Sequence, residues 1–390
     1  MKRLAIITTH PIQYNAPLYK LLTERGIIKI KVFYTWGDQV LQNKYDPGFK
    51  KTIEWDIPLL EGYDYQFVEN ISTCPGSNHY NGIINPTLIE EIKNWGPDSL
   101  LVYGWKFNSH LKCINYFHKK IPIYFRGDST LLDKKNKVYL FIKKIILKPI
   151  YKKIDTFFYV GKANKEYFLK NGVQKNKLVF APHAVDNKRF GDDEAKKNSK
   201  NELKITADDF VFLFAGKFEN KKNPMLLLKT FIELPYKKAI LLFVGNGELE
   251  LKLKSFCLNL DKSIRDRIYF MNFQNQSKMP YIYQNVNAFV LPSQGPEETW
   301  GLSVNEAMAS GIPVIVSDKC GCSYDIVKNY ETGLIFKSNN EQGLLDSMNY
   351  MLSNMELTKE MGNNAKKLIS HWSFENICKT IEETVSLCRI

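Results

Sequence analysis

The sequence predicts an α/β protein with two domains, each a doubly wound parallel β-sheet with helices on both faces. Short apolar runs typical of buried strands alternate with helical segments along the whole chain. With 390 residues, the chain is long enough for about two domains, each with its own hydrophobic core. A polar stretch from Gly191 to Lys200 separates two series of such runs and is typical of a surface linker.

Apolar runs predict a series of strands in each half of the chain. In the first half they are Leu4–Thr9, Ile30–Tyr34, Leu100–Tyr103, Ile121–Phe125, Thr156–Val160 and Leu178–Ala181. In the second half they are Phe210–Ala215, Ile240–Val244, Ile268–Met271, Ala288–Leu291, Pro313–Ser317 and Gly333–Phe336. We therefore expect one domain in residues 1–190 and a second in residues 191–370, followed by a helical pattern in residues 371–390.

Positive charge is concentrated in the first half of the chain. Residues 1–190 contain 30 lysine and arginine residues against 16 aspartate and glutamate residues, whereas residues 191–390 contain 24 against 25. Much of the excess lies in residues 134–153, where Lys144, Lys148 and Lys152 recur every four residues with apolar residues between them. This spacing predicts a basic amphipathic helix.

Two interpretations of this helix remain open. In the first it lies on an anionic membrane leaflet, where each lysine near the surface contributes about 1 kcal/mol. In the second its apolar side packs on its own domain while the lysines face water. We expect no nucleic-acid partner, because no helix-turn-helix, zinc-finger or RNA-binding signature accompanies the charge.

The expected location is the cytoplasm, with peripheral attachment to the inner face of the cell membrane if the basic helix binds lipid. No apolar run reaches the roughly 18 residues that a membrane span needs, and the start of the chain leads into a strand rather than a signal peptide. Seven cysteines without a CxxC pair suit a reducing compartment. Cys320 and Cys322 are too close together for the usual zinc spacings.

The most informative segment is Leu291–Ser317, where an apolar strand ends in a glycine-bearing loop that opens a helix. The backbone N–H groups of Gly301, Leu302 and Ser303 are expected to be first-turn donors that suit a phosphate or pyrophosphate. Glu298 and Glu306 lie on either side of this helix start, where Glu306 is expected to reach ligand hydroxyls. An anion at the amides and a carboxylate for hydroxyls together describe a sugar nucleotide.

The same segment resembles the donor-binding motif of retaining glycosyltransferases of family 4, also called glycosyl transferases group 1. The residues that carry the resemblance are Pro292-Ser293, Glu298, Gly301, Glu306-Ala307-Met308-Ala309, Gly311 and Pro313-Val314-Ile315. The resemblance implies the GT-B fold, in which two Rossmann-like domains face each other across a cleft. It also implies that the helix of residues 371–390 packs back on the N-terminal domain, that this domain binds the acceptor and that the second domain binds the donor.

The resemblance assigns further donor-site residues in the second domain. The loop from Gly216 to Pro224 is similar to a family pattern in which an arginine and a lysine clamp the donor diphosphate, placing Lys217 and Lys222 at those positions. Lysine at residue 217 is a departure, because it lacks the bidentate fork of arginine. Gly245 belongs to a loop like the family's next glycine loop, and Thr299 neighbours the residues on which donor choice depends.

The first domain departs most from the family. Its first loop, Thr9–Pro17, lacks the glycines that let the backbone approach the donor phosphate, so the side chains of His10, Gln13 and Asn15 are the candidates for contact with acceptor or donor. After the fourth strand, where many members carry a histidine, this chain has Arg126-Gly127-Asp128. Carboxyl ends of parallel strands are where ligands bind in such folds. Arg126 is a candidate for a phosphate or acidic sugar and Asp128 for a hydroxyl, although a structural Arg–Asp pair is equally compatible with the pattern.

These pieces imply transfer of a sugar from a nucleotide donor to a hydroxyl with retained configuration, in which Glu298, Asp128, Arg126 and His10 are the catalytic candidates. The acceptor is expected to be a lipid-linked glycan or saccharide of cell-surface polysaccharide synthesis. Neither a cofactor nor a divalent metal is expected, because the chain contains no Asp-x-Asp motif. Two other classes remain open: a sugar-nucleotide 2-epimerase of the same fold and a non-catalytic protein that binds the membrane surface.

Overall fold

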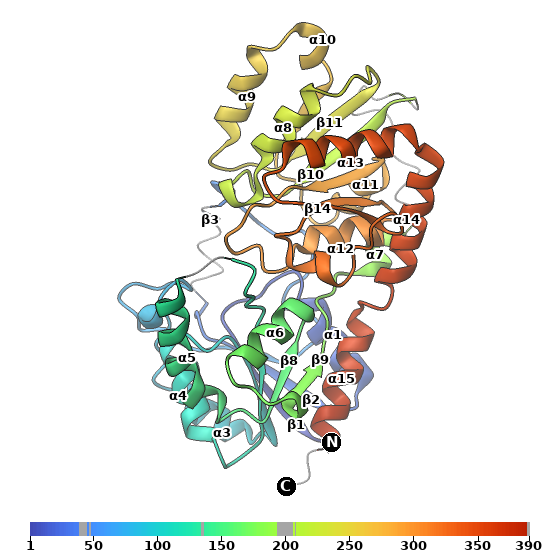
Figure 1. Cartoon of the computed structure of the whole chain (residues 1–390). Coiled ribbons are helices and arrows are strands. Elements are labelled where there is room, and N and C mark those ends of the chain that lie inside the picture. Colours follow the sequence, from blue (N-terminus) through green and yellow to red (C-terminus); the bar gives the residue numbers. More distant parts are fainter. Residues whose placement is uncertain (39–44, 47, 134–135, 193–205, 207, 388–390) are drawn as a thin grey trace. The chain divides into compact units, whose positions relative to one another are not determined.

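The structure is a computed structural model that describes residues 1–38, 45–46, 48–133, 136–192, 206 and 208–387. The chain divides into two compact units, coloured along the sequence in Figure 1. Unit 1 consists of Met1–Lys44, Ile57–Pro182 and Phe374–Ile390. Unit 2 consists of Tyr45–Asp56 and His183–Ser373.

Unit 1 contains a seven-stranded parallel sheet. In sheet order its strands are β5 (Tyr65–Phe67), β2 (Lys29–Tyr34), β1 (Arg3–Thr8), β6 (Ser99–Tyr103), β7 (Ile123–Arg126), β8 (Thr156–Tyr159) and β9 (Leu178–Phe180). Its helices are α1 (Ala16–Arg25), α3 (Leu88–Trp95), α4 (Asn108–Phe117), α5 (Lys137–Tyr151), α6 (Lys162–Lys170) and α15 (Phe374–Leu387), with short 3-10 turns η1 (Tyr80–Gly82) and η2 (Lys175–Lys177). All strands expected in this half are present, and the edge strand β5 is additional.

Unit 2 contains a six-stranded parallel sheet. In sheet order its strands are β12 (Ile268–Met271), β11 (Ala239–Val244), β10 (Phe210–Ala215), β13 (Ala288–Leu291), β14 (Val314–Ser317) and β15 (Gly333–Phe336), and the pair β3 (Tyr45–Asp46) and β4 (Lys51–Thr52) is separate and antiparallel. Its helices are α7 (Asn187–Gly191), α8 (Pro224–Ile232), α9 (Glu250–Leu258), α10 (Lys262–Arg265), α11 (Met279–Gln284), α12 (Leu302–Ala309), α13 (Glu341–Ser353) and α14 (Met355–Ile369), with 3-10 turns η4 (Asn220–Lys222) and η5 (Gly321–Tyr324). The strands expected in this half are all present.

The strand order of both sheets reverses beside the first strand of each unit. In unit 1 this switch point lies between β1 and β6, and in unit 2 it lies between β10 and β13. In doubly wound folds, ligands bind outside the carboxyl ends of the strands at such a point. The fully buried strands β10 and β11 explain why this half of the sequence shows continuous apolar runs rather than alternation.

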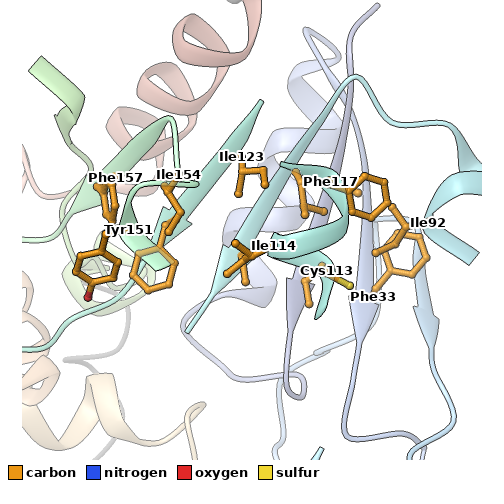
Figure 2. Close-up of a cluster of buried hydrophobic side chains, with 14 of the residues drawn as sticks. Phe33, Ile92, Cys113, Ile114, Phe117, Ile123, Tyr151, Ile154 and Phe157 are labelled. Carbon is orange, nitrogen blue, oxygen red and sulfur yellow. The ribbon is translucent and has the colours of Figure 1, made fainter. Parts of the chain in front are cut away.

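The core of unit 1 is rich in aromatic rings (Figure 2). The ring of Phe157 lies 5.7 Å from that of Phe125, 5.1 Å from that of Tyr151 and 5.1 Å from that of Phe168. Tyr151 and Leu147 are the buried residues of α5, and both belong to the core cluster that holds this helix on the unit.

The basic helix expected in residues 134–153 is observed as α5, while residues 134–135 lie outside the described residues. Lys144, Lys148 and Lys152 are exposed, as expected for a helix with one basic side. In the described part of the chain, no helix combines the length and the apolar character needed to cross a membrane.

The boundary between the units lies earlier than the expected residue 190. His183 and the residues that follow it belong to unit 2, because α7 packs against α11. The ring of Phe190 is buried and lies 5.8 Å from that of Tyr283, and the Gln284 side-chain amide donates to the backbone oxygens of Phe190 and Asp192, both at 2.8 Å. Residues 193–200 of the polar stretch that was expected as a linker lie outside the described residues.

The last helix, α15, belongs to unit 1 and packs on α1. The Arg25 guanidinium donates to both carboxylate oxygens of Glu382, at 2.7 and 2.8 Å. The Glu382 side chain is only 4% exposed, so the carboxylate of this bidentate ion pair is shielded from solvent.

We expect Glu382→Gln to lower the free energy of opening of α15 by about 1–3 kcal/mol, because a charge-assisted pair is lost at a buried position. Peptide-resolved hydrogen–deuterium exchange of α15 measures this directly. Glu383→Gln is the matched control, since the pair of Glu383 with Lys379 is exposed on both sides and is worth less than about 1 kcal/mol. Equal effects of the two substitutions would contradict the prediction.

Candidate functional site

Loops at the carboxyl ends of β10, β11 and β13 meet in unit 2. The backbone N–H of Phe218, after β10, donates to the oxygen of Asn246, after β11, at 2.9 Å. Gln294, after β13, donates from its backbone to the oxygen of Lys221 at 2.8 Å and from its side chain to the oxygen of Asn220 at 2.7 Å. The three loops therefore form one connected surface at the switch point of the sheet.

Glycine permits the close contact between the first two loops. Gly245 has a φ of +141°, and a Cβ atom there would lie 2.0 Å from the backbone oxygen of Gly216. No side chain fits at that distance, so the backbones of Gly216 and Gly245 pack directly on each other. The structure thus places both predicted donor-site glycines at the switch point.

Lys222 and Glu298 form a buried ion pair at this point. The Lys222 Nζ donates to Glu298 Oε2 at 2.8 Å, and the Ser293 hydroxyl donates to the same oxygen at 3.2 Å. The side chains of Lys222 and Glu298 are only 14% and 9% exposed. Lys222, expected at the donor diphosphate, and the catalytic candidate Glu298 are therefore in direct contact.

The ion pair keeps both partners charged despite their burial. Burial alone would raise the pKa of the Glu298 carboxyl, but the charge and hydrogen bond of Lys222 hold this pKa below its ordinary value. Burial alone would lower the pKa of Lys222, and Glu298 raises it instead. The pair contributes a fixed positive and a fixed negative charge to the site.

Helix α12 begins beside this pair. Gly301 precedes it in the left-handed conformation, with a φ of +97°. The described part of the chain offers no acceptor to the backbone N–H groups of Gly301, Leu302 and Ser303. Three open amides at the positive end of a helix form a place where an anion binds favourably.

The backbone of Thr299 is held against the next loop. A Cβ atom at Gly321 would lie 1.8 Å from the Thr299 oxygen, and the Gly321 N–H donates to the Glu298 oxygen at 3.2 Å. The turn that follows β14 thus contacts the loop that carries Glu298 and Thr299 and holds its backbone in place.

Glu306 lies on α12 and is 4% exposed. The Tyr283 hydroxyl donates to Glu306 Oε2 at 3.0 Å. Its carboxylate therefore does not point into bulk water, and Tyr283 on α11 fixes its position. The expectation that Glu306 contacts hydroxyls of a ligand stays a prediction.

Lys217 follows β10 and lies nearer to solvent than Lys222. Its Nζ is 2.9 Å from Asp46 Oδ1, and it lies 5.1 Å from the centre of the Phe49 ring. The sequence analysis did not predict this partner, because Asp46 lies in the first half of the chain.

The predicted residues of the first loop lie in unit 1, at the carboxyl end of β1. His10 is half-buried, its Nδ1 lies 2.9 Å from the Thr9 hydroxyl and its ring contacts Trp36 edge-on at 5.2 Å. Burial lowers the pKa of His10. Gln13 and Asn15 are also half-buried, between β1 and α1.

Arg126 and Asp128 follow β7 in unit 1, and the structure gives them different environments. Arg126 is buried and donates to the backbone oxygens of Ala181 and Pro182, both at 2.8 Å. Its guanidinium therefore ties the end of β7 to the segment after β9. Asp128 is exposed.

Sequence reasoning missed a buried polar network around Trp300. The Trp300 indole donates to the Asn305 side-chain oxygen at 2.8 Å, and the Asn305 amide donates to the His183 oxygen at 3.2 Å. The Trp300 ring also stacks on Trp372 at 5.2 Å. The sequence feature that could have predicted this network is the tryptophan inside a glycine-bearing loop, because a large aromatic residue there needs a packing partner.

Among the described residues, no group of three or more His, Cys, Asp or Glu side chains is arranged to hold a metal ion. Cys320 and Cys322 are buried. Burial raises the pKa of the Cys320 thiol to about 12, so it remains protonated at neutral pH.

Comparisons with known proteins agree with this architecture. Residues 195–368 match the family described as Glycosyl transferases group 1. An uncharacterized glycosyltransferase of Methanocaldococcus jannaschii is 28% identical over 199 residues, which are 50% of this chain and 49% of that protein. The lipopolysaccharide 1,2-N-acetylglucosaminetransferase of Salmonella typhimurium is 25% identical over 194 residues, which are 48% of this chain and 50% of that protein. The chain thus spans about half the length of these curated relatives.

A solved structure resembles the whole chain. Anabaena HepE in complex with UDP matches with a TM-score of 0.75 over 100% of both chains, at 15% sequence identity. At this identity the likeness concerns the fold alone. Together with the two parallel sheets, it identifies the architecture as the GT-B fold that the sequence predicted.

We expect Glu298→Gln to lower the free energy of unfolding of unit 2 by about 3–5 kcal/mol at neutral pH, because Lys222 is left buried without a counter-charge. The folded pKa of Glu298 is depressed, so its stabilisation is present above its ordinary value of 4.5 and is lost as the pH falls through the folded pKa. The difference between wild type and variant should therefore shrink below pH 4.5.

Thermal and chemical denaturation of both proteins across this pH range provides the measurement. Combining Glu298→Gln with Lys222→Met removes both charges and should recover part of the lost stability. A double variant no more stable than the single one, or a difference independent of pH, would show that the ion pair is not the cause.

Proposed function

We propose that this chain, which belongs to the glycosyl transferases group 1 family through residues 195–368, transfers a sugar from a nucleotide-sugar donor to a hydroxyl acceptor with retained configuration. The observation that carries the proposal is the buried Lys222–Glu298 pair beside the open amides of Gly301, Leu302 and Ser303. A fixed cation next to free backbone donors suits a diphosphate.

The donor is assigned to unit 2. Its diphosphate lies against the start of α12, with Lys222 and Lys217 supplying positive charge. The UDP complex of Anabaena HepE supports a uridine nucleotide as the first donor class to test, since the two chains share their fold. Glu306, held by Tyr283, is the group that we assign to the sugar hydroxyls.

The reaction depends on charge stabilisation at the departing diphosphate. As the bond from the anomeric carbon to the phosphate oxygen breaks, negative charge grows on that oxygen, and Lys222 and the α12 amides are already oriented to stabilise it. The acceptor hydroxyl attacks from the same face, and the leaving phosphate helps to take its proton. Glu298 holds Lys222 in place through their hydrogen bond, which makes it a positioning residue.

The acceptor is assigned to unit 1, with His10, Gln13, Asn15 and Asp128 as candidate contacts at the carboxyl edge of its sheet. Arg126 is assigned a positioning role, because its terminal nitrogens donate to the Ala181 and Pro182 carbonyls. The name of the Salmonella relative supports an acceptor among the glycans of cell-surface polysaccharide.

Incubation of the full chain with UDP-sugars and candidate glycan acceptors tests this proposal, with the product configuration read by NMR. We expect transfer with retention, unaffected by EDTA. A product of inverted configuration, or activity abolished by EDTA and restored by magnesium, would contradict the proposal. Epimerisation of the donor without nucleotide release would favour the 2-epimerase.

Lys222→Ala should lower kcat/KM by about 100-fold or more, as expected for loss of a preorganised charge at the leaving group. Lys221→Ala is the control, since this neighbouring lysine pairs with Glu219 on the surface of the same loop. Comparable losses in both variants would remove Lys222 from the mechanism.

We also propose that α5 attaches the enzyme to an anionic membrane surface. Phe141 and Ile145 are 65% and 57% exposed, and their spacing places them on one side of the helix with Lys148 and Lys152. Large apolar side chains on the outer side of a helix are costly in water, and lysines beside them complement anionic headgroups. A membrane-bound enzyme would meet a lipid-linked acceptor at the surface where that acceptor resides.

Changing Lys144, Lys148 and Lys152 together to Glu should reduce partition onto phosphatidylglycerol-containing vesicles by on the order of 100-fold, because each lysine near such a surface contributes about 1 kcal/mol. Vesicle co-sedimentation at fixed salt measures the change. Soluble-acceptor turnover should remain, since these exposed lysines lie outside the donor site.

The matched control carries the same charge reversals at Lys29, Lys170 and Lys175, which are exposed elsewhere on unit 1. A second variant, Phe141→Ser with Ile145→Ser, separates apolar insertion from simple charge attraction. Equal loss in the lysine control, or no loss in any variant, would contradict attachment through α5.

A further inference from the structure

A segment from the first half of the sequence belongs to the donor-binding unit. Residues 45–46 and 48–56, which we call the latch segment, lie between β2 and β5 in the sequence, yet they are part of unit 2. In Figure 1 the blue strand β3 accordingly appears with the green and yellow elements of that unit.

One end of the latch segment contacts Lys217. Asp46 Oδ1 lies 2.9 Å from the Lys217 Nζ and also accepts the backbone N–H groups of Gly48 at 2.8 Å and Phe49 at 3.1 Å. The Phe49 ring lies over the same ammonium group. Burial alone would raise the pKa of Asp46, but the Lys217 hydrogen bond and these amides hold it below its ordinary value. The carboxylate is therefore a negative charge.

The other end of the segment is anchored to the turn after β12. The Ser277 hydroxyl and backbone N–H donate to the Asp56 carboxylate, and the Asn275 side chain donates to the Glu54 backbone oxygen. The ring of Trp55 contacts Phe273 edge-on at 6.0 Å. These contacts do not involve Lys217, so this end can stay bound when the contact of Asp46 is broken.

We propose that the Asp46 carboxylate occupies the place beside Lys217 where a phosphate group of the nucleotide binds. Binding of a nucleoside diphosphate therefore displaces Asp46 from Lys217. The inference rests on the proposed function, since it takes Lys217 as a diphosphate ligand. Asp46 acts as an affinity-determining residue, because every donor molecule must exchange it for its own phosphate oxygens.

The displacement follows from charge. A diphosphate bound to Lys217 brings negative charge next to the Asp46 carboxylate, and like charges at contact distance repel. The diphosphate also binds the α12 amides and Lys222, whereas Asp46 has a single cation in a pair that is about a third exposed. A partly exposed ion pair of this kind is weak. Lys217 therefore binds the diphosphate in preference to Asp46. The cost of breaking the pair appears as weaker nucleotide binding.

Calorimetric titration of wild type and Asp46→Asn with UDP and with GDP tests the proposal. The variant should bind the nucleotide about fivefold more tightly, a difference of about 1 kcal/mol. Asp208→Asn is the matched control, because it removes the same charge from a lysine pair, with Lys238 at 3.0 Å, next to the amino end of β10. Its affinity should equal that of wild type.

Hydrogen–deuterium exchange supplies a second measurement. Addition of UDP to wild type should increase exchange of the Gly48 and Phe49 amides, because Asp46 releases them. Unchanged or weaker nucleotide binding by Asp46→Asn, or protection of these amides by UDP, would overturn the inference. The proposed function would remain intact in that case if the wild-type protein transfers sugar. Failure of wild type to bind either nucleotide would refute the proposed function, and the inference with it.

Discussion

The buried ion pair between Lys222 and Glu298 is the constraint on which the site in unit 2 depends. Lys222 comes from the loop after β10 and Glu298 from the loop after β13, the two strands on either side of the switch point. Neither charge is tolerated in a buried position without the other. Any displacement of either loop separates the pair, so their packing and the electrostatics of the site are set together.

The two lysines of the β10 loop have contrasting environments, and this contrast suggests different roles. Lys222 is buried and paired with a carboxylate on a loop held by Ser293 and by the turn at Gly321. Lys217 is about a third exposed, and its partner Asp46 lies on a segment with a separate anchor at Ser277. In the proposed function the first pair stays formed when the nucleotide binds, whereas the second pair is broken.

Much of the fold, and the candidate residues for a donor site, could be predicted from the sequence, because local patterns carry both. Most strands of both sheets are apolar runs, and the segment around Glu298 and Gly301 holds its motif within a few residues. The fold is confirmed, and residues 195–368 match the family that the motif indicated. Partners distant in sequence were not predictable. Asp46 lies far from Lys217 along the chain, and β5 consists of three partly exposed residues without an apolar run.

Contacts between residues distant in sequence also decide how the basic helix packs, which is why the sequence alone allowed two interpretations of it. Periodicity shows that lysines and apolar residues recur along α5, but it does not show which of the apolar residues the aromatic core covers. The core accommodates Leu147 and Tyr151, while Phe141 and Ile145 remain in solvent. A helix whose apolar side simply packed on its own domain would bury these residues, because their exposure forfeits the hydrophobic stabilisation of burial. Their exposure beside Lys148 and Lys152 therefore favours a surface that binds something apolar and anionic, and a lipid leaflet has both properties.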